Sequence, residues 1–223
     1  MKKQRGNAEI LMDILFPPKC VSCGEYLNGV ARFLCPACEK TLFIADGFKR
    51  DKLACEGFCA PYFYEGAAKA AMGRLKFGSN IDVAPFFSTA LLQSIRCDFF
   101  GVDFDIITCV PSTRSSIAKR GYNQAQVIAE DIKIDADFDP NLLKKRTDTG
   151  TQHLLDAYSR QKNIESAYAL NRGRMVTGKT ILLIDDILTT GATVNACARE
   201  LYYSGAKAVY VACATVTRHE KEN

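Results

Sequence analysis

ILLIDDILTTGAT, residues Ile181–Thr193, is the stretch that says most about the architecture of this chain. Its first four residues are apolar without a break, as in a strand that is buried on both faces of a parallel sheet. A helical pattern follows over Gly191–Tyr203, and Ala208–Val216 has the composition of another strand. Strand, helix and strand in this order predict a crossover unit, and therefore an α/β fold with a doubly wound parallel sheet.

The second half of the same stretch carries polar groups that suit a phosphorylated sugar. Two adjacent carboxylates come at the predicted carboxyl end of the strand, where ligands bind in open α/β sheets. Gly191 allows a ligand to approach the backbone closely, and the free amides of the first helical turn favour a phosphate. The carboxylates suit sugar hydroxyls and a hydrated Mg²⁺. Helix capping explains one of these residues but not the whole set. The predicted site comprises Asp185, Asp186, Thr189, Thr190, Gly191, Ala192 and Thr193.

A second polar segment follows a strand predicted at Asp105–Val110. It begins with Pro111 and carries the cations Arg114, Lys119 and Arg120. Guanidinium groups match the geometry of phosphate and stay charged at any cellular pH. Taken alone, such a segment is more often a solvated basic loop. A phosphate loop in the same sheet favours an anion site here, at Arg114 and Arg120.

Four of the ten cysteines form a cluster near the N-terminus. The pairs Cys20-x-x-Cys23 and Cys35-x-x-Cys38 are eleven residues apart, which predicts two knuckles that complete a tetrahedral Zn²⁺ site. Disulfides and an iron–sulfur cluster are the alternatives, but a reducing cytosol and the two-plus-two spacing favour zinc. Four thiolate ligands make the metal structural. The remaining cysteines are a leftover pair, Cys55 and Cys59, and four that we expect to be small buried hydrophobes: Cys97, Cys109, Cys197 and Cys213.

The chain divides into an N-terminal zinc-binding module at residues 1–61 and an α/β domain at residues 62–223. Its 223 residues, 48% of them hydrophobic, are enough for one core and a small accessory unit, and the net charge of +4 is mild. The apolar piece Ile10–Phe16 predicts a short amphipathic helix rather than a membrane span or a signal peptide. We therefore expect a cytoplasmic protein without membrane insertion. Further helices are expected at Gly66–Phe77, Val83–Arg96 and Asn123–Ile132.

The combination of these motifs resembles the ComF family. The thirteen-residue stretch is similar to the 5-phosphoribosyl-1-pyrophosphate (PRPP) motif of type I phosphoribosyltransferases. The zinc-type cysteines, the Val-Pro-x-x-Arg segment Val110–Arg114, and Arg120-Gly121-Tyr122-Asn123-Gln124 extend the resemblance over nearly the whole chain, together with Gln152, Arg160 and Asn163. ComF-like sequences often carry a second set of Cys-x-x-Cys pairs, which is truncated here to Cys55 and Cys59.

The resemblance implies a division of roles. Asp185 and Asp186 hold the ribose hydroxyls, and Thr189 through Thr193 cradle the 5-phosphate. Residues 147–163 form a lid that closes over the reacting sugar. Arg114 and Arg120 serve the pyrophosphate end, so that Asp185, Asp186 and Arg120 are the catalytic candidates and Mg²⁺ accompanies PRPP.

Two functions from different classes fit the sequence. The first is a phosphoribosyltransferase that releases pyrophosphate and modifies an acceptor that the sequence does not name. The second is a non-catalytic module that senses PRPP or a nucleotide while its zinc module and basic loops bind single-stranded DNA. The ComF resemblance adds a link to competence and DNA uptake, with competence-machinery proteins as further partners.

Overall fold

The computed structural model describes residues 17–27, 31–77, 80–146 and 167–218. The helix expected at Ile10–Phe16 and the lid expected at residues 147–163 lie outside these ranges, as do both histidines of the chain, His153 and His219.

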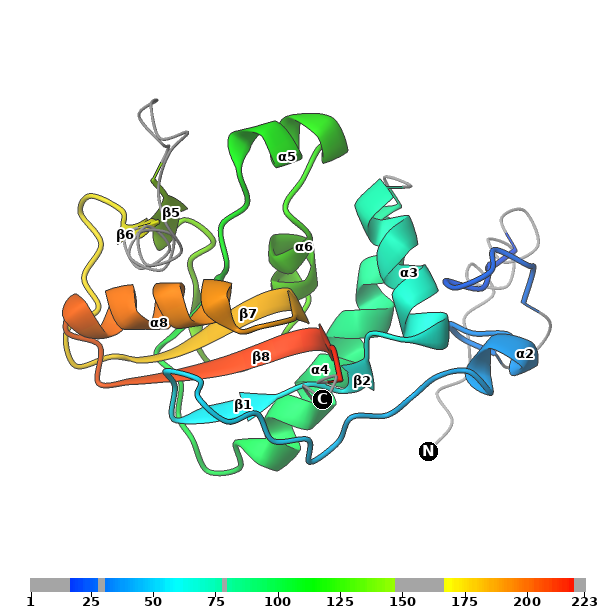
Figure 1. Cartoon of the computed structure of the whole chain (residues 1–223), viewed down its shortest axis with the longest axis horizontal. Helices are drawn as coiled ribbons and strands as arrows, with labels where there is room; N and C mark the ends of the chain where they lie inside the picture. The colour runs from blue at the N-terminus through cyan, green and yellow to red at the C-terminus, as the bar shows by residue number, and fades with distance from the viewer. Residues whose placement is uncertain (1–16, 28–30, 78–79, 147–166, 219–223) are drawn as a thin grey trace, which may run out of the picture.

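A parallel sheet forms the centre of the molecule (Figure 1). Its strand order is β1 (Gly57–Cys59), β8 (Ala208–Val216), β7 (Thr180–Leu188), β3 (Ile106–Cys109) and β4 (Asp137–Phe138), and β2 (Tyr62–Phe63) pairs with the end of β8. The expected strands at residues 105–110, 181–184 and 208–216 are therefore present. Strand β7 is longer than expected, because it continues through both aspartates and pairs with β8 as far as Leu188.

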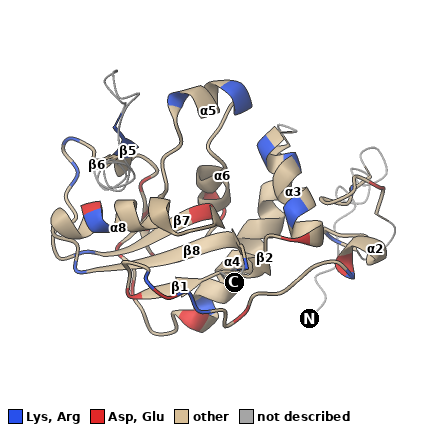
Figure 2. Cartoon of the chain, viewed as in Figure 1, with Lys and Arg blue, Asp and Glu red and all other residues tan. Residues whose placement is uncertain are grey.

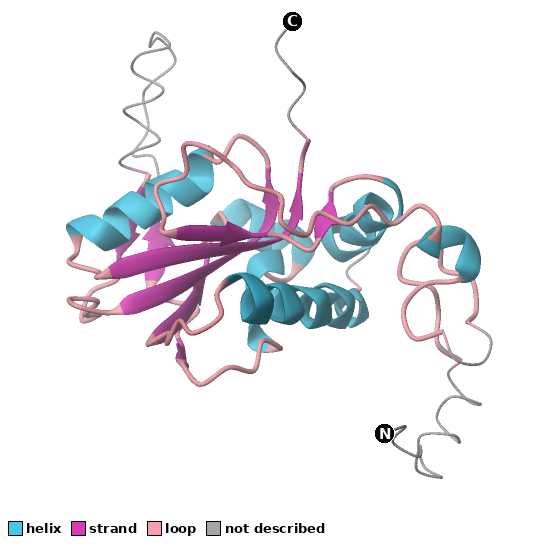
Figure 3. Ribbon diagram, turned by 90° about the horizontal axis from the view of Figure 1, so that it is seen from below, coloured by secondary structure: helices cyan, strands magenta, loops and turns pink. Residues whose placement is uncertain are grey.

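Helices cover both faces of this sheet, as a doubly wound fold requires (Figures 1 and 3). Helices α3 (Gly66–Phe77), α4 (Ala84–Asp98) and α6 (Gln124–Glu130) share one core with Leu182 and Ile184, whereas α8 (Ala192–Tyr203) shares the other with Ile181 and Leu183. Successive residues of a strand point to opposite faces, so an unbroken apolar run buries its side chains in both cores. The helices expected from the periodicity at residues 66–77, 83–96 and 123–132 are confirmed within two residues at each end.

Two shorter elements lie at the carboxyl end of β3 and β4. Helix α5 (Arg114–Arg120) follows soon after β3. Strands β5 (Leu143–Lys145) and β6 (Tyr168–Leu170) form a two-stranded antiparallel ribbon that is separate from the main sheet. A single 3₁₀ turn, η1 (Ile81–Val83), connects α3 to α4.

The N-terminal cysteine-bearing segment packs against the face of the α/β body that α3 and α4 cover. It contains one short helix, α2 (Pro36–Glu39), and its apolar residues Val21, Leu27 and Leu34 belong to the same core as α3 and α4. Strand β1, which precedes the boundary expected after residue 61, lies in the main sheet beside β8. The division into residues 1–61 and 62–223 stays a prediction. Among the described helices, none is long and apolar enough to cross a membrane.

Three of the four cysteines expected in the core are buried there. Cys109, Cys197 and Cys213 have no appreciable exposure, but Cys97 is exposed. Helix α4 buries Leu91 and Ile95, one turn apart, and Cys97 lies two residues further on, so its side chain projects from the opposite side of the helix.

Candidate functional site

The two aspartates lie inside β7 rather than beyond its end. Asp185 is only 9% exposed, and its carboxylate Oδ1 accepts a hydrogen bond of 2.9 Å from the amide of Asp186. We expected both carboxylates at an exposed strand end, and for Asp185 this was wrong, because pairing of β7 with β8 continues past it. Burial, reinforced by the neighbouring charge of Asp186, raises the pKa of Asp185 well above its ordinary value.

A lysine from a distant helix completes this acidic pair. Lys76, in the last turn of α3, places its Nζ 2.7 Å from Oδ2 of Asp186. Both side chains are largely buried, with 16% and 17% exposure. The Lys76 ammonium thus offsets the charge of Asp186, the carboxylate next to the buried Asp185. Sequence reasoning missed Lys76, because a single lysine at a helix end carries no motif.

The threonine-rich turn after β7 presents its hydroxyl-bearing residues to solvent. Thr189, Thr190 and Thr193 are exposed, and Gly191 is the N-cap of α8 with φ 83°. Thr190 Oγ1 accepts a hydrogen bond from the amide of Ala192 at 3.3 Å. The first turn of a helix offers amides that have no intrahelical acceptor, and the helix dipole makes this end positive. The turn therefore offers the hydrogen-bond donors that a phosphate requires, at the N-terminus of the twelve-residue helix α8.

Residues 48–55, which we call the connector, lie against the outside of this turn. Asn195 of α8 accepts a hydrogen bond from the amide of Ala54 at 2.7 Å and donates one to the carbonyl of Lys52 at 3.1 Å. Arg50 donates to the carbonyl oxygens of Thr189 and Thr217. The connector is thus hydrogen-bonded both to the backbone of the turn, at Thr189, and to the first part of α8, at Asn195. No motif in the sequence predicts this contact.

The same packing explains why the helix begins with glycine. A Cβ atom on Gly191 would come within 2.7 Å of Leu53 Cδ2, and its φ of +83° is a conformation that other residues rarely adopt. Gly191 therefore serves both the left-handed turn and the close approach of the connector.

Arg114 and Arg120 are separated by a helix, although we expected both on one loop. Thr113 caps α5 by accepting a hydrogen bond from the amide of Ser116 at 3.1 Å, and Gly121 ends the helix with φ 87°. Seven residues between these caps place the two arginines at opposite ends, and Figure 2 shows basic residues at both ends of α5. A cap at each end was the signal in the sequence that could have predicted the helix.

The two arginines consequently face different surroundings. Arg114 lines a cleft of about 830 Å³ at the carboxyl ends of β3 and β4, whose other cations are Lys144, Lys145 and Arg146. Arg120 lies near α3: its guanidinium is 5.6 Å from the ring centre of Phe77 and donates a 2.9 Å hydrogen bond to Gln124. Because Phe77 follows Lys76, Arg120 is the arginine on the side of the aspartate pair.

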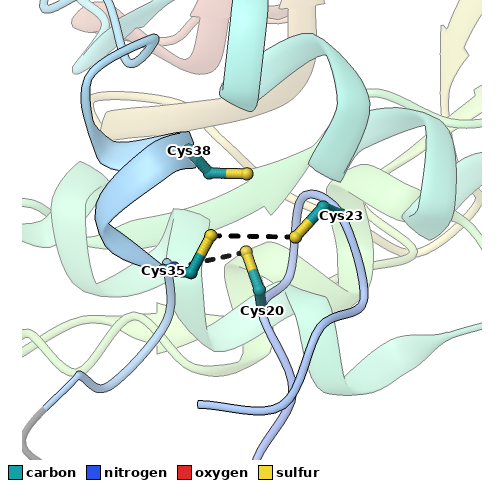
Figure 4. Close-up of side chains that lie close together, drawn as sticks. All are labelled: Cys20, Cys23, Cys35 and Cys38. Carbon is teal, nitrogen blue, oxygen red and sulfur yellow. Dashed lines mark hydrogen bonds between the residues drawn. The ribbon is translucent and has the colours of Figure 1, made fainter. Parts of the chain in front are cut away.

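The four clustered cysteines converge as their spacing predicted (Figure 4). All four Sγ atoms lie within 4.8 Å of one another, and those of Cys23 and Cys35 are 3.8 Å apart. Tetrahedral Zn²⁺ with Zn–S bonds of about 2.3 Å requires sulfur atoms roughly 3.8 Å apart, so the geometry fits this metal. Burial opposes ionisation of Cys20, but hydrogen bonds from the amides of Cys23 and Cys35 outweigh it and lower its pKa to about 6. Gly24, which follows the second cysteine of the first knuckle, has φ 85°, a backbone angle that favours glycine.

Cys55 and Cys59 belong to no comparable cluster within the described ranges. Burial raises the pKa of Cys55 to about 11, and Cys59 is buried in the core at the end of β1. In this part of the chain the pair packs as apolar side chains.

Comparison with known proteins agrees with this architecture. Residues 89–223, more than half of the chain, match the phosphoribosyl transferase domain family, and residues 11–66 match the double zinc ribbon domain. Competence protein ComFC of Bacillus subtilis (strain 168) is 25% identical over 211 residues, which cover 89% of this chain and 83% of that protein. DNA utilization protein YhgH of Escherichia coli (strain K12) is 30% identical over 145 residues, or 63% of each chain. The match thus spans less than two thirds of that relative's length. Among solved structures, the allosteric regulatory enzyme of purine biosynthesis aligns with 64% of this chain and 30% of its own at 19% identity and a TM-score of 0.42.

A phosphoribosyltransferase-type sheet joined to an N-terminal four-cysteine module defines the class of protein. The chain belongs to the phosphoribosyl transferase domain family, as a phosphoribosyltransferase-type protein of the ComF family.

Proposed function

We propose that this protein binds PRPP together with Mg²⁺ and transfers the phosphoribosyl group to an acceptor, with release of pyrophosphate. The observation that carries the proposal is the junction of β7 and α8. Two adjacent carboxylates, one of them buried, lead directly into an exposed threonine-rich turn at a helix N-terminus. The carboxylates suit the ribose hydroxyls, and the turn suits the 5-phosphate.

The roles proposed for the ribose end follow from this placement. Asp185 and Asp186 accept hydrogen bonds from the two ribose hydroxyls, and the Lys76 ammonium offsets the charge of Asp186. Amides and hydroxyls of Thr189 through Thr193 donate to the 5-phosphate, while the connector holds α8 in place through its hydrogen bonds to Asn195. Such fixed donors lower the barrier by holding the sugar in one orientation.

The proposed pyrophosphate end uses the cations of α5. Departure of pyrophosphate from the sugar leaves an oxocarbenium-like centre and concentrates negative charge on the leaving group, so preorganised guanidinium groups stabilise the transition state. Arg120 lies near the end of α3 that carries Lys76, and Arg114 lines the cleft at the carboxyl ends of β3 and β4. Mg²⁺, when bound with PRPP, would neutralise further phosphate charge.

A second function has its own support. The relatives include a competence protein and a DNA utilization protein. A non-catalytic protein that senses PRPP or a nucleotide and binds single-stranded DNA during uptake accounts for this relationship. In either form we propose a cytoplasmic protein that works with the competence machinery.

Pyrophosphate release from PRPP distinguishes the two functions. The zinc-loaded full-length protein is incubated with PRPP, Mg²⁺ and a panel of amines, nucleobases and oligonucleotides, while calorimetry measures PRPP affinity in parallel. Turnover with any acceptor supports the transferase. Tight PRPP binding without turnover favours the sensing module, and absence of PRPP binding contradicts both.

A further inference from the structure

A cavity of about 350 Å³ lies between the zinc-binding segment and the α/β body, away from the β7–α8 junction. Its walls come from both sides: Lys19 and Arg32 from the cysteine-bearing segment, and Arg74 and Asp82 from α3 and η1. Three cations therefore face a single carboxylate among the residues that line it.

Arg74 has an unsatisfied guanidinium at this cavity. Its Nε atom is buried and has no hydrogen-bond partner, and the described part of the chain supplies no ion pair to the side chain. One terminal nitrogen lies under the zinc knuckle, 2.9 Å from the position that a Cβ of Gly24 would take. Buried polar groups in folded proteins are almost always hydrogen-bonded, and arginine has five donors and no acceptor. An arginine held in this way is available to an acceptor that the described residues do not supply.

The other two cations are held at the same cavity by aromatic rings. Lys19 Nζ lies 5.0 Å from the ring centre of Tyr26, and the Arg32 guanidinium lies 5.0 Å from that of Phe33. Ring contacts position a cation without neutralising its charge, so both stay available to an anion. Phe33 itself lines the cavity beside the prolines Pro17, Pro18 and Pro85, which give it an apolar wall.

We propose that this cavity binds a phosphate group. A guanidinium fork matches the oxygens of phosphate, and an apolar wall beside it suits an attached sugar or base. The ligand is either free phosphate or a phosphate of a single-stranded nucleic acid, and both present the same tetrahedral anion.

This site is separate from the one proposed for PRPP. Arg74 and Lys76 are two residues apart on α3, which places their side chains about 200° apart around the helix. Lys76 contacts Asp186 on one side, and Arg74 faces the zinc knuckle on the other. One helix therefore separates the two anion sites, and either can exist without the other.

The test compares Arg74→Gln and Arg32→Gln in the zinc-loaded full-length protein, with Arg96→Gln as the control. Arg96 is exposed on α4 and away from the cavity, so its loss changes the net charge equally. One arm titrates inorganic phosphate by NMR in phosphate-free buffer, and the other titrates a single-stranded oligonucleotide by fluorescence anisotropy. We expect Arg74→Gln to weaken the bound probe about ten- to a hundredfold, as for the loss of a charge-assisted hydrogen bond, with PRPP affinity unchanged.

The outcomes separate the sources of the phosphate. A loss confined to the oligonucleotide arm identifies a nucleic-acid strand, and a loss in the phosphate arm identifies the free anion. If Arg74→Gln releases zinc, Arg32→Gln decides, because its exposed side chain is not needed for packing. The proposal is overturned if the wild type binds neither probe, or if both cavity variants behave like Arg96→Gln.

Discussion

Asp185 illustrates how a buried carboxyl group exchanges stability for ligand binding. Burial and the charge of Asp186 raise its pKa, so the folded protein holds a proton that the unfolded chain releases above a pH of about 4. A folded state that binds more protons loses stability as the pH rises. The stability lost by burying Asp185 is therefore absent in acid and grows as the pH rises through neutral.

We predict that Asp185→Asn stabilises the ligand-free protein and weakens PRPP binding. Asparagine cannot ionise, so the melting temperature of the variant should exceed that of the wild type at pH 7–8. The two melting temperatures should converge towards pH 4. The amide is a poorer acceptor for a ribose hydroxyl, and we expect a loss of PRPP affinity of about ten- to a hundredfold. Melting curves across pH and calorimetry with PRPP check the two halves.

Asp186→Asn is the matched comparison for this substitution. It leaves Lys76 without its partner, so it should lower the melting temperature at neutral pH although it weakens PRPP in the same direction. If both variants lowered the melting temperature, Asp185 would not be the carboxyl group whose burial destabilises the folded protein.

Arg120 should act on the pyrophosphate end of PRPP and leave the 5-phosphate unaffected. It projects from the end of α5 near α3, whereas the 5-phosphate is assigned to the turn before α8. Arg120→Ala should weaken PRPP about ten- to a hundredfold, the cost of one charge-assisted hydrogen bond, and leave ribose 5-phosphate nearly unchanged. Titration of both ligands measures the difference, and Lys119→Ala, one residue away and exposed, is the control. Equal weakening of both ligands would place Arg120 elsewhere.

At the scale of elements, the connector and α8 form a unit that positions the phosphate turn. Asn195→Ala removes both hydrogen bonds to the connector and leaves the Lys52 carbonyl and the Ala54 amide unpaired. We predict a loss of about 1–3 kcal/mol of stability and weaker binding of ribose 5-phosphate, with inorganic pyrophosphate affinity unchanged. Asn195→Asp, which keeps the acceptor for Ala54, should recover part of the affinity.

Gln93→Ala provides the control for the connector, because α4 covers the opposite face of the sheet and Gln93 is exposed there. Calorimetry with the two ligands separates a positioning role from general destabilisation. If ribose 5-phosphate and pyrophosphate weaken together, Asn195 stabilises the fold and does not position the turn.

The elements that could be predicted from the sequence are those whose signal is local. The apolar run of β7, the periodicity of α3, α4 and α8, and the cysteine spacing all report short-range constraints, and the structure has each of them. The contacts of Lys76, Arg50 and Asn195 could not be predicted, because each is a single polar side chain that reaches a segment far away in the chain. Asp185 could be identified as a site candidate, but its burial depends on how far β7 pairs with β8.

At the scale of the whole molecule, the mild net charge limits how nucleic acid can bind. With +4 overall, any contact has to come from local groups of Lys and Arg, such as the cleft with Arg114 and Lys144–Arg146. We predict that DNA binding prefers single strands and falls steeply with salt, because phosphate contacts release counterions. Anisotropy titrations of single- and double-stranded oligonucleotides across salt concentrations test this. Affinity that does not change with salt would exclude a phosphate-driven contact.

The zinc cluster should stabilise more than its own segment. Val21, Leu27 and Leu34 share a core with α3 and α4, and α3 carries Lys76 to the aspartate pair. We therefore expect the metal to support the proposed PRPP site indirectly, through α3. Metal analysis should find one Zn²⁺ per chain, because four thiolates form a closed tetrahedron whose binding energy is folding energy.

Cys38→Ser should release the metal, lower the melting temperature and weaken PRPP binding by a smaller factor than Asp185→Asn, while the circular dichroism of the parallel sheet persists. Cys97→Ser, at an exposed cysteine outside the cluster, should change none of these. Iron with visible absorbance, or an unchanged melting temperature after Cys38→Ser, would contradict a structural zinc site.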